Sequence, residues 1–332
     1  MKRNRLSVDQ YVSGILSGDR MVLSRAITLV ESTLESDQML ADKVMEKVIP
    51  YSGNSIRIGI TGVPGVGKST FIEAFGIRVI EDGHKLAVLA VDPSSQNSGG
   101  SILGDKTRME KLSADKRAYI RPSPAGTTLG GVSAKTREAM ILCEAAGFDV
   151  IFIETVGVGQ SEISVRGMVD FFLLLMLAGA GDELQGIKKG IIEMCDALVI
   201  NKADGENVEA SKKAKREYAN ALHLFPLKEN GWTPKVKMSS ALSGEGLQDI
   251  WEMIGTFIEQ VKSKGYFESN RASQRVNWLH EHISFMLTSR FYQDKDIKAV
   301  LNASLEDVRK GKLSSITLGR TLVERFIRKN ED

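Results

Sequence analysis

The segment 62–69 has the residue types and spacing of a phosphate-binding loop. It reads GVPGVGKS and fits the pattern G-x-x-x-x-G-K-[ST]. Glycines allow backbone N–H groups to turn towards an anion, and the amino end of a following helix adds positive potential. We expect Lys68 to contact the β- and γ-phosphates of a nucleotide and the Ser69 hydroxyl to ligate Mg²⁺. The nucleotide-binding residues predicted from this motif are Gly62, Val63, Pro64, Gly65, Val66, Gly67, Lys68, Ser69 and Thr70.

The sequence around this loop argues against a simple glycine-rich turn. An apolar run at 56–60 precedes the loop, and a helical pattern at 69–79 follows it. A strand, a loop and a helix in this order form the context in which the motif binds phosphates. The motif therefore predicts a nucleoside triphosphate site, and other residues must select the base.

A second motif predicts that the base is guanine. Asn201, Lys202 and Asp204 form N-K-x-D directly after an apolar run at 197–200. The Asp204 carboxylate can accept hydrogen bonds from N1–H and the 2-amino group of guanine, whereas adenine would leave this acceptor without a partner. The stem of Lys202 can lie across the base, and Asn201 can tie the two loops together. The turn after the next strand matches the loop that touches guanine O6, and its predicted nucleotide-binding residues are Ser240, Ala241 and Leu242.

Acidic residues at the ends of predicted strands are candidates for holding Mg²⁺. Glu154 and Gly157 follow the apolar run 150–153, where a carboxylate can hold a water of the Mg²⁺ shell and a glycine N–H can meet the γ-phosphate. Asp92 ends the run 86–91, and Asp105 lies in the long segment after it. The alternatives are a turn-initiating aspartate before proline for Asp92 and a solvated loop carboxylate for Asp105. The predicted metal ligands are Ser69, Asp92, Asp105 and Glu154, and the predicted catalytic residues are Lys68, Asp92, Asp105 and Glu154.

Hydrolysis at such a site is phosphoryl transfer to water, which is helped mainly by positioning and charge. The sequence has no obvious counterpart of a water-orienting glutamine at a fixed place after Gly157, although Gln160 and Glu162 are nearby. We therefore expect slow turnover by the isolated chain, with a partner completing the site by reordering its loops.

These motifs need a scaffold that brings several strand ends together. Apolar runs occur at 56–60, 86–91, 150–153, 171–177, 197–200 and 236–238 and alternate with helical patterns. Such runs joined by helical crossovers predict an α/β fold with a mostly parallel, doubly wound sheet. Ligands bind beyond the carboxyl ends of the strands in such sheets, and all the motifs fall there. The Gly-, Ser- and Pro-rich segment 93–132 interrupts the alternation, and we expect mobile segments there that sense the nucleotide.

The two ends of the chain are predicted to be helical extensions of the α/β domain. Residues 1–50 predict an N-terminal helical cap, with Ser7 and Gln10 as a capping box. Residues 51–263 predict the nucleotide-binding domain, and residues 264–332 predict a helical arm. The apolar stripe of this arm must be buried either against the rest of the chain or in a two-fold dimer.

Composition narrows the classes of partner and compartment. With 44 Lys+Arg and 42 Asp+Glu the net charge is +2, which is too small a field to predict nucleic acid or an anionic membrane as a partner. Cys143 and Cys195, without any C-x-x-C, suit a reducing compartment and core positions. The first residues lack the apolar region of a signal peptide, and the run 171–178 is too short to span a membrane. The sequence therefore predicts a cytoplasmic protein.

Five segments together resemble the MeaB/ArgK family. They are 62–70, 91–95 (VDPSS), 99–109 (GGSILGDKTRM), 154–162 (ETVGVGQSE) and 201–204 (NKAD). Members of this family are GTPases that guard methylmalonyl-CoA mutase and related adenosylcobalamin-dependent enzymes, and the resemblance covers nearly the whole chain. It implies a homodimeric, Mg²⁺-dependent P-loop GTPase that binds the mutase, gates delivery of its cobalamin cofactor and helps to exchange damaged cofactor.

The resemblance also implies that the mutase stimulates hydrolysis. The segment 178–188, with Asp182, Gln185 and Lys188, matches a loop that responds to the complex. Which mutase is the client, and whether an adenosyltransferase joins the complex, stay open. So do two other functions: a kinase that passes the γ-phosphate to a transport protein or an amino acid, and a nucleotide-gated scaffold with negligible turnover. A nickel-inserting metallochaperone GTPase of related fold is disfavoured, because the Cys and His ligands of those proteins are missing.

Overall fold

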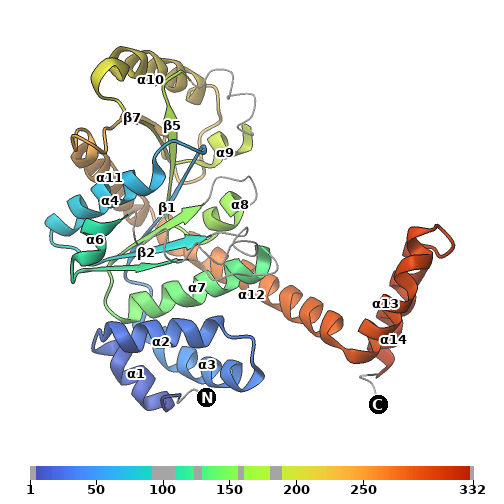
Figure 1. The fold of residues 1–332 in the computed structure, drawn as a ribbon. Helices are drawn as coiled ribbons and strands as arrows, with labels where there is room; N and C mark the ends of the chain where they lie inside the picture. Colours follow the sequence, from blue (N-terminus) through green and yellow to red (C-terminus); the bar gives the residue numbers. More distant parts are fainter. Residues whose placement is uncertain (1–4, 92–108, 123–128, 156–160, 180–188, 330–332) are drawn as a thin grey trace. The chain divides into compact units, whose positions relative to one another are not determined.

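The computed structural model describes residues 5–91, 109–122, 129–155, 161–179 and 189–329 (Figure 1). Two compact units make up the chain, Met1–Gln274 and Arg275–Asp332. The first unit contains the sheet and all the motif residues that the structure describes, whereas the second consists of helices. The nucleotide-site predictions can therefore be followed within one unit.

Seven parallel strands form one sheet within the described residues. They are β1 (Ile56–Gly62), β2 (Leu86–Val91), β3 (Ala118–Arg121), β4 (Val150–Thr155), β5 (Phe171–Leu177), β6 (Ala197–Asn201) and β7 (Lys235–Met238). Their order is β3-β2-β4-β1-β5-β6-β7, so β1 lies between β4 and β5. From this centre, one crossover runs outward to β2 and later ones run the other way to β6 and β7. The α/β prediction is confirmed, and the carboxyl end of β1 lies where such folds bind ligands.

The middle of the segment 93–132 differs from the expectation. It contains a short helix, α6 (Glu110–Ala114), and the strand β3, which pairs with β2 so that Leu86 lies opposite Ala118. β3 has four residues, too few for strand periodicity to stand out between glycine- and proline-rich neighbours. The segments 92–108 and 123–128, to which the expectation of mobile nucleotide sensors applies, lie outside the described residues.

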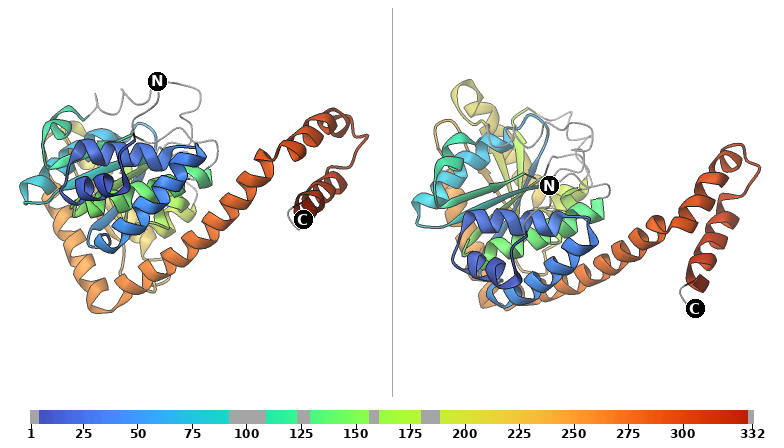
Figure 2. Two further views of the ribbon diagram at one scale, coloured as in Figure 1. Left: turned by 90° about the horizontal axis from the view of Figure 1, so that it is seen from below. Right: turned by 60° about the horizontal axis from the view of Figure 1, so that its bottom comes forward.

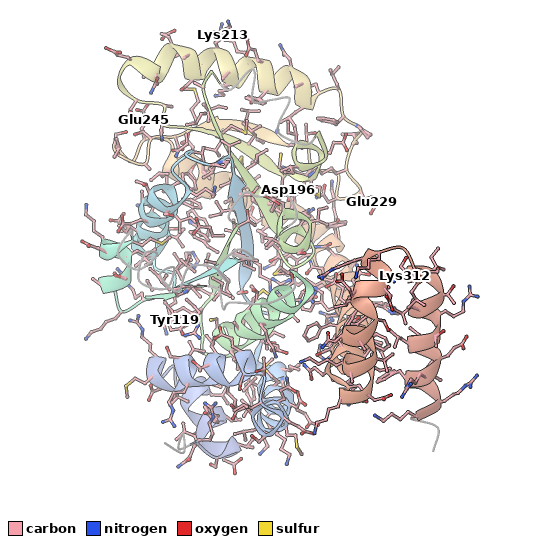
Figure 3. The ribbon with its side chains drawn as sticks, turned by 45° about the vertical axis from the view of Figure 1, so that its right-hand side comes forward. Tyr119, Asp196, Lys213, Glu229, Glu245 and Lys312 are labelled. Atoms are coloured by element: carbon pink, nitrogen blue, oxygen red, sulfur yellow. The ribbon has the colours of Figure 1, made fainter. Side chains whose placement is uncertain are left out.

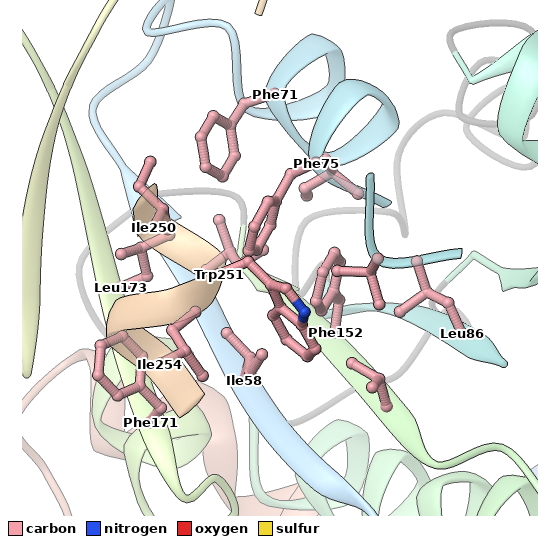
Figure 4. Packing of buried hydrophobic residues seen from close by; sticks show 14 of the residues in the cluster. Ile58, Phe71, Phe75, Leu86, Phe152, Phe171, Leu173, Ile250, Trp251 and Ile254 are labelled. Atoms are coloured by element: carbon pink, nitrogen blue, oxygen red, sulfur yellow. The ribbon is translucent and has the colours of Figure 1, made fainter. Parts of the chain in front are cut away.

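Aromatic side chains attach α4 (Lys68–Glu81), the helix that follows the phosphate-binding loop, to the sheet (Figure 4). Phe75 of α4 stacks on Phe152 of β4, with ring centroids 5.2 Å apart. Trp251 of α11 (Leu247–Ser263) meets Phe75 edge-on at 6.2 Å, and its indole N–H donates to Asp82 Oδ2 at 2.8 Å. Buried rings carry much of the packing energy of a core. The cluster therefore fixes where α4 begins, and with it the phosphate-binding loop.

The other face of the sheet is covered by α7 (Leu129–Ala145) and the three N-terminal helices (Figures 1 and 2). These helices are α1 (Val8–Leu16), α2 (Arg20–Glu31) and α3 (Glu35–Val48), and they pack on α7 and on one another. Neighbouring side chains of β3 point to opposite faces of the sheet. Ile120 joins the core cluster of α4, whereas the Tyr119 hydroxyl lies 3.0 Å from Ser24 Oγ of α2. The predicted capping box is confirmed, because Ser7 Oγ accepts from the Gln10 N–H at 3.2 Å and Gln10 Oε1 accepts from the Ser7 N–H at 2.9 Å.

Three further helices connect the remaining strands: α8 (Ser161–Arg166) lies between β4 and β5, α9 (Lys189–Met194) between β5 and β6, and α10 (Val208–Leu222) between β6 and β7. The 3₁₀ turn η1 (Ile49–Tyr51) precedes β1, and η3 (Gly205–Asn207) precedes α10. Cys143 and Cys195 are both fully buried, and burial raises the pKa of both thiols, that of Cys195 to about 12. They are therefore neutral core residues at ordinary pH, as their sparse use predicts.

The C-terminal helices are α12 (Tyr266–Gln293), α13 (Lys295–Arg309) and α14 (Ser315–Lys329). α12 starts in the first unit, where Arg271 is buried and donates to Asp170 Oδ1 at 2.8 Å. In the second unit Phe291 of α12 meets Phe326 of α14 at 5.4 Å, and Arg325 pairs with Asp296. An apolar stripe of α12 remains exposed, and it consists of Val276, Leu279, Ile283, Met286 and Leu287.

A buried polar network holds the amino end of β1. Glu144 of α7 accepts hydrogen bonds from the Gly53 N–H at 2.8 Å, from the Ser55 hydroxyl, and from Arg57 Nε at 2.7 Å and Nη2 at 3.0 Å. Burial alone would raise the pKa of Glu144, but the hydrogen bonds and the charge of Arg57 outweigh it and lower the pKa. The carboxylate is thus stabilised in its charged form by the fold itself.

Replacing this carboxylate is expected to destabilise the protein. Glu144→Gln should lower the free energy of unfolding by about 3 kcal/mol, because a neutral amide leaves the buried Arg57 guanidinium without its counter-charge. Since the folded-state pKa of Glu144 is depressed, this stabilisation is present above the ordinary pKa of 4.5 and disappears as pH falls through the folded value. Denaturant titration followed by tryptophan fluorescence measures both effects. Glu46→Gln, at an exposed position on α3, is the matched control, and equal midpoints for the two variants would contradict the prediction.

Candidate nucleotide-binding site

The phosphate-binding loop has the backbone that its glycines predict. β1 ends at Gly62, α4 begins at Lys68, and Gly65 and Gly67 take φ values of 78° and 85° in the left-handed region. An added Cβ at Gly62 would lie 2.6 Å from the carbonyl oxygen of Leu175, so the close approach of β5 excludes any larger residue there. The loop therefore turns sharply between a central strand and a helix amino terminus, the arrangement that presents N–H groups to phosphates.

Lys68 lies inside this loop. Its Nζ donates to the carbonyl oxygen of Gly62 at 2.9 Å and to that of Val63 at 3.3 Å. Burial lowers the pKa of Lys68, while the carboxylates of Glu154 and Glu162 oppose this change. An ammonium with little water around it gains more from an incoming phosphate than a solvated one does. The position predicted for Lys68 is thus one that can hold a phosphate group.

Two side chains join the N-K-x-D loop to the phosphate-binding loop. Asn201 Nδ2 donates to the Val66 carbonyl oxygen at 2.8 Å, and Lys202 Nζ donates to the Gly65 carbonyl oxygen at 2.9 Å. Asn201 is buried and its Oδ1 also accepts from Ser239 Oγ at 3.2 Å. Lys202 takes a φ of 56°, which is rare for a residue with a side chain and aims its stem along the loop. The tie that the sequence suggested for Asn201 is present in the structure.

The residues predicted for guanine recognition come together after β6 and β7. Asp204 Oδ2 accepts a hydrogen bond from the Ser240 hydroxyl, which itself accepts from the Ser243 N–H at 3.1 Å. Gly246 has a φ of 78°, and an added Cβ would lie 2.2 Å from the Met238 carbonyl oxygen, so this turn requires glycine. The turn thereby holds Ser240 against the Asp204 carboxylate and leaves its other lone pairs for a base. Ala241 packs on the core cluster, whereas Leu242 is 84% exposed.

The oxygen atoms proposed for Mg²⁺ meet at the end of the central strands. Ser69 Oγ lies 3.5 Å from Glu154 Oε1, and Glu154 is 9% exposed. Beside them, Thr155 Oγ1 donates to Thr61 Oγ1 at 2.7 Å, which links the ends of β4 and β1. Hydroxyl and carboxylate oxygens are what a hard divalent cation prefers, so this donor set fits Mg²⁺. The other predicted ligands, Asp92 and Asp105, and also Gly157, lie outside the described residues.

A family model described as methylmalonyl Co-A mutase-associated GTPase MeaB matches residues 23–296, which include both loops and the whole sheet. The chain belongs to the MeaB family. GTPase ArgK of Escherichia coli is 44% identical over 321 residues, which cover 97% of each protein. The mitochondrial methylmalonic aciduria type A homolog of Mus musculus is 44% identical over 96% of this chain and 79% of the relative.

A solved structure described as LAO/AO transport system kinase has a TM-score of 0.75 and 38% identity, and it covers 99% of this chain and 100% of that one. These relatives and the sheet order show that this MeaB-family chain has a P-loop GTPase fold. The family is one of GTPases, so the reaction at the site is the hydrolysis of GTP. The resemblance seen in the motifs is confirmed.

Sequence reasoning missed several side-chain roles in this MeaB-family site. Glu162 is 1% exposed and acts on the charge of Lys68, although the sequence pointed to it only as a neighbour of Gly157. The sequence did not predict that the hydroxyls of Ser239 and Ser240 hold Asn201 and Asp204. The sequence signal that could have indicated these roles is the pair of serines directly after β7. Asp182, Gln185 and Lys188, predicted to respond to a partner, lie outside the described residues.

The described residues of this MeaB-family chain also bear on membrane insertion and on further metal sites. No described helix is long and apolar enough to cross a membrane. The part of the chain that the structure describes also holds no group of three or more His, Cys, Asp or Glu side chains that could bind a metal ion. A cation beside Ser69 and Glu154 would take its further ligands from phosphate oxygens, from water, or from the predicted ligands Asp92 and Asp105, which lie outside the described residues.

Proposed function

We propose that this chain is a Mg²⁺-dependent GTPase that binds methylmalonyl-CoA mutase, or a related adenosylcobalamin-dependent mutase, gates cofactor loading, and protects or reactivates the enzyme. The observation that carries the nucleotide part is the link from Asn201 to Val66 and from Lys202 to Gly65, which couples the base loop to the phosphate loop. The client part is supported by the description of the family as mutase-associated. A site that reads both ends of GTP can report the state of the nucleotide to a partner.

The proposed roles of the chain in hydrolysis are binding, orientation and charge stabilisation. Backbone N–H groups of the loop 62–69, apart from Pro64, which has none, would hold the phosphates, and the Lys68 ammonium would stabilise negative charge on them as it develops. Asp204 would select guanine. Glu154 would orient groups around the γ-phosphate, with Asp92, Asp105 and Gly157 as further proposed members of the site.

Mg²⁺ is the proposed cofactor, and Ser69 and Glu154 are the described residues that would hold it. When bound, such an ion neutralises charge on the β- and γ-phosphate oxygens. Ser69→Ala is expected to raise the Mg²⁺ concentration for half-maximal hydrolysis about tenfold, because one oxygen ligand is lost. A Mg²⁺ titration of the hydrolysis rate measures it. Ser263→Ala, at an exposed position on α11, is the control, and an unchanged Mg²⁺ requirement in Ser69→Ala would remove this residue from the site.

The client proposal is tested with the purified chain and the mutase of the same organism. We expect a complex in the presence of GTP and a higher rate of GTP hydrolysis than for the chain alone. No complex and no change in rate would count against the mutase as client. Comparing the affinity of the mutase for the GTP-bound and GDP-bound chain, alongside turnover, separates a hydrolysing chaperone from a scaffold with negligible turnover.

A homodimer formed through the C-terminal arm is also proposed, on the basis of the exposed stripe of α12. Leu279 is 57% exposed and Ile283 is 45% exposed, and side chains at this spacing lie on one face of a helix. Leu279→Asp combined with Ile283→Asp is expected to turn a dimer into a monomer in sedimentation velocity. Lys213→Asp on exposed α10 is the control for added charge, and a wild-type chain that is monomeric at all concentrations would refute the proposal.

A kinase function is the second candidate, because the relative of known structure is described as a transport system kinase. The same GTPase assay distinguishes the two. Radioactive γ-phosphate that appears as free phosphate supports hydrolysis, and radioactive γ-phosphate on a protein or amino acid acceptor supports a kinase. Among the described residues, Lys68 donates to the carbonyl oxygens of the loop and Ser69 lies against Glu154, so these contacts favour hydrolysis over transfer to a bound acceptor.

A further inference from the structure

A groove with a volume of about 710 Å³ lies at the β3 end of the sheet, away from the nucleotide-binding residues. One wall comes from the first half of α2, another from Ser113 of α6, and the floor from four consecutive residues, 119–122. The Tyr119 side chain in the floor lies between the sheet and the N-terminal helices (Figure 3). None of the motifs of the nucleotide site contributes to this groove.

The lining shows that the groove runs along the open edge of β3. Alternate side chains of a strand point to opposite faces, yet three consecutive residues of β3, Tyr119 to Arg121, line this groove together with Pro122 after the strand, which fits a groove that passes along the strand edge. The walls agree with this geometry, since α2 belongs to the Tyr119 face of the sheet, whereas Leu112 of α6 packs in the core cluster on the Ile120 face. The groove therefore borders the backbone as well as the side chains of β3, and Tyr119 and Ile120 are only 5% and 8% exposed within it.

The backbone of β3 has hydrogen-bonding groups directed into this edge. Leu86 N–H donates to the Arg117 carbonyl oxygen at 2.9 Å, which sets the parallel ladder so that alternate residues of β3 face β2. Ala118, of the other set, donates its N–H to the Asp115 carbonyl oxygen at 3.1 Å. By the same alternation, the N–H and C=O of Ile120 face away from β2. Within the described residues no strand pairs with β3 on this side.

The charge of the groove has one sign. Its charged lining residues are Arg20, Arg25 and Arg121, with no Asp or Glu among them. Arg121 is paired with Glu31, and Arg20 Nη1 donates to the Asp115 carbonyl oxygen at 3.5 Å. Arg20 and Arg25 both lie at exposed positions on α2. Burial raises the pKa of Tyr119 to about 12, so this phenol adds no negative charge at ordinary pH. The groove is therefore complementary to a chain that carries carboxylates.

We propose that the edge of β3 is a docking site for an extended, acidic segment of a partner protein. The segment adds as a further strand along Ile120 and directs its carboxylates towards Arg20 and Arg25. Addition of a strand to an exposed sheet edge supplies affinity through main-chain hydrogen bonds, and the side chains beside the edge supply selectivity. This inference concerns a surface separate from the nucleotide site, and it does not depend on which client the protein serves.

The test uses the full-length protein and three fluorescent peptides. The first alternates Glu and Val, the second replaces Glu with Lys, and the third is the acidic peptide with alternate backbone amides methylated. Fluorescence anisotropy is expected to show binding of the acidic peptide, no binding of the basic one, and at least about tenfold weaker binding of the methylated one. Hydrogen exchange at the Ile120 amide should slow when the acidic peptide binds.

Charge reversal supplies the matched variants. Arg20→Glu with Arg25→Glu is expected to weaken acidic-peptide binding at least about tenfold, while Lys212→Glu with Lys213→Glu on α10 leaves it unchanged. Three results would overturn the proposal: no binding of the acidic peptide, equal binding of the methylated peptide, or an Ile120 amide already protected without peptide. The last would mean that a segment of this chain fills the edge. Unchanged melting temperatures show that the variants are folded.

Discussion

Lys68→Ala is expected to reduce the rate of GTP hydrolysis by about a hundredfold to a thousandfold. The ammonium lies within the turn of the phosphate-binding loop, 2.9 Å from the Gly62 carbonyl oxygen and 3.3 Å from that of Val63. Because it is partly buried, its charge is poorly screened and acts strongly on a phosphate at the mouth of the loop. The loss should be larger in kcat than in the affinity for GDP, since charge on the γ-phosphate oxygens grows towards the transition state.

Two comparisons sharpen this prediction. Lys68→Arg keeps the positive charge, but its larger planar head cannot occupy the same turn, and we expect it to recover little of the rate. Lys213→Ala, whose side chain is 80% exposed on α10, should hydrolyse GTP at the wild-type rate. Phosphate release under saturating GTP is the measurement. If Lys68→Ala retained more than about a tenth of the activity, another group would have to supply the stabilising charge.

Asp204→Asn is expected to exchange the base that the protein prefers. The Asp204 carboxylate is held by the Ser240 hydroxyl, and its remaining lone pairs can accept from N1–H and the 2-amino group of guanine. An asparagine amide can accept from N1–H but opposes the 2-amino group with a donor, so GTP should bind about a hundredfold more weakly. Xanthine carries a carbonyl oxygen at that position, so XTP should gain affinity for the variant.

A gain in affinity for XTP would distinguish a change in base recognition from a loss of folding. A variant that failed to fold would lose both nucleotides, whereas a change in base recognition loses one and gains the other. Glu206→Gln, two residues away at an exposed position, is the matched control and should keep its preference for GTP. Isothermal titration with GTP, XTP and ATP measures all three affinities. Equal weakening for GTP and XTP in Asp204→Asn would show that the carboxylate does not contact the base edge.

The sequence predicted the α/β fold and the parts of the site that depend on neighbouring residues. The loop around Lys68 and the N-K-x-D run each need only a strand before them, and strands buried on both faces appear as continuous apolar runs. Because parallel strands end at the same edge, placing the runs was enough to place Ser69, Glu154 and Asn201 together. The confirmed capping box likewise depends only on two residues close in sequence, Ser7 and Gln10.

The remaining features depend on packing between distant segments. β3 has four residues, and its place at the sheet edge follows from pairing with β2 and not from its own pattern. The bond from Ser240 to Asp204 requires the turn that Gly246 permits against the Met238 carbonyl oxygen. Glu162 comes close enough to act on the charge of Lys68 because α8 packs against β1 and β4, and spacing along the chain does not show this packing.

Because Asn201 and Lys202 donate to the phosphate loop, the loop that we propose to select the base also holds the loop that we propose to support turnover. A small molecule bound only beside Asn201, Lys202 and Asp204, where we propose that the guanine lies, would also restrain the backbone at Gly65 and Val66. Compounds without any phosphate could therefore inhibit turnover as a non-hydrolysable nucleotide does. Substitutions of Asn201 or Lys202, which donate to the loop carbonyl oxygens, would cause resistance as readily as substitutions of Asp204.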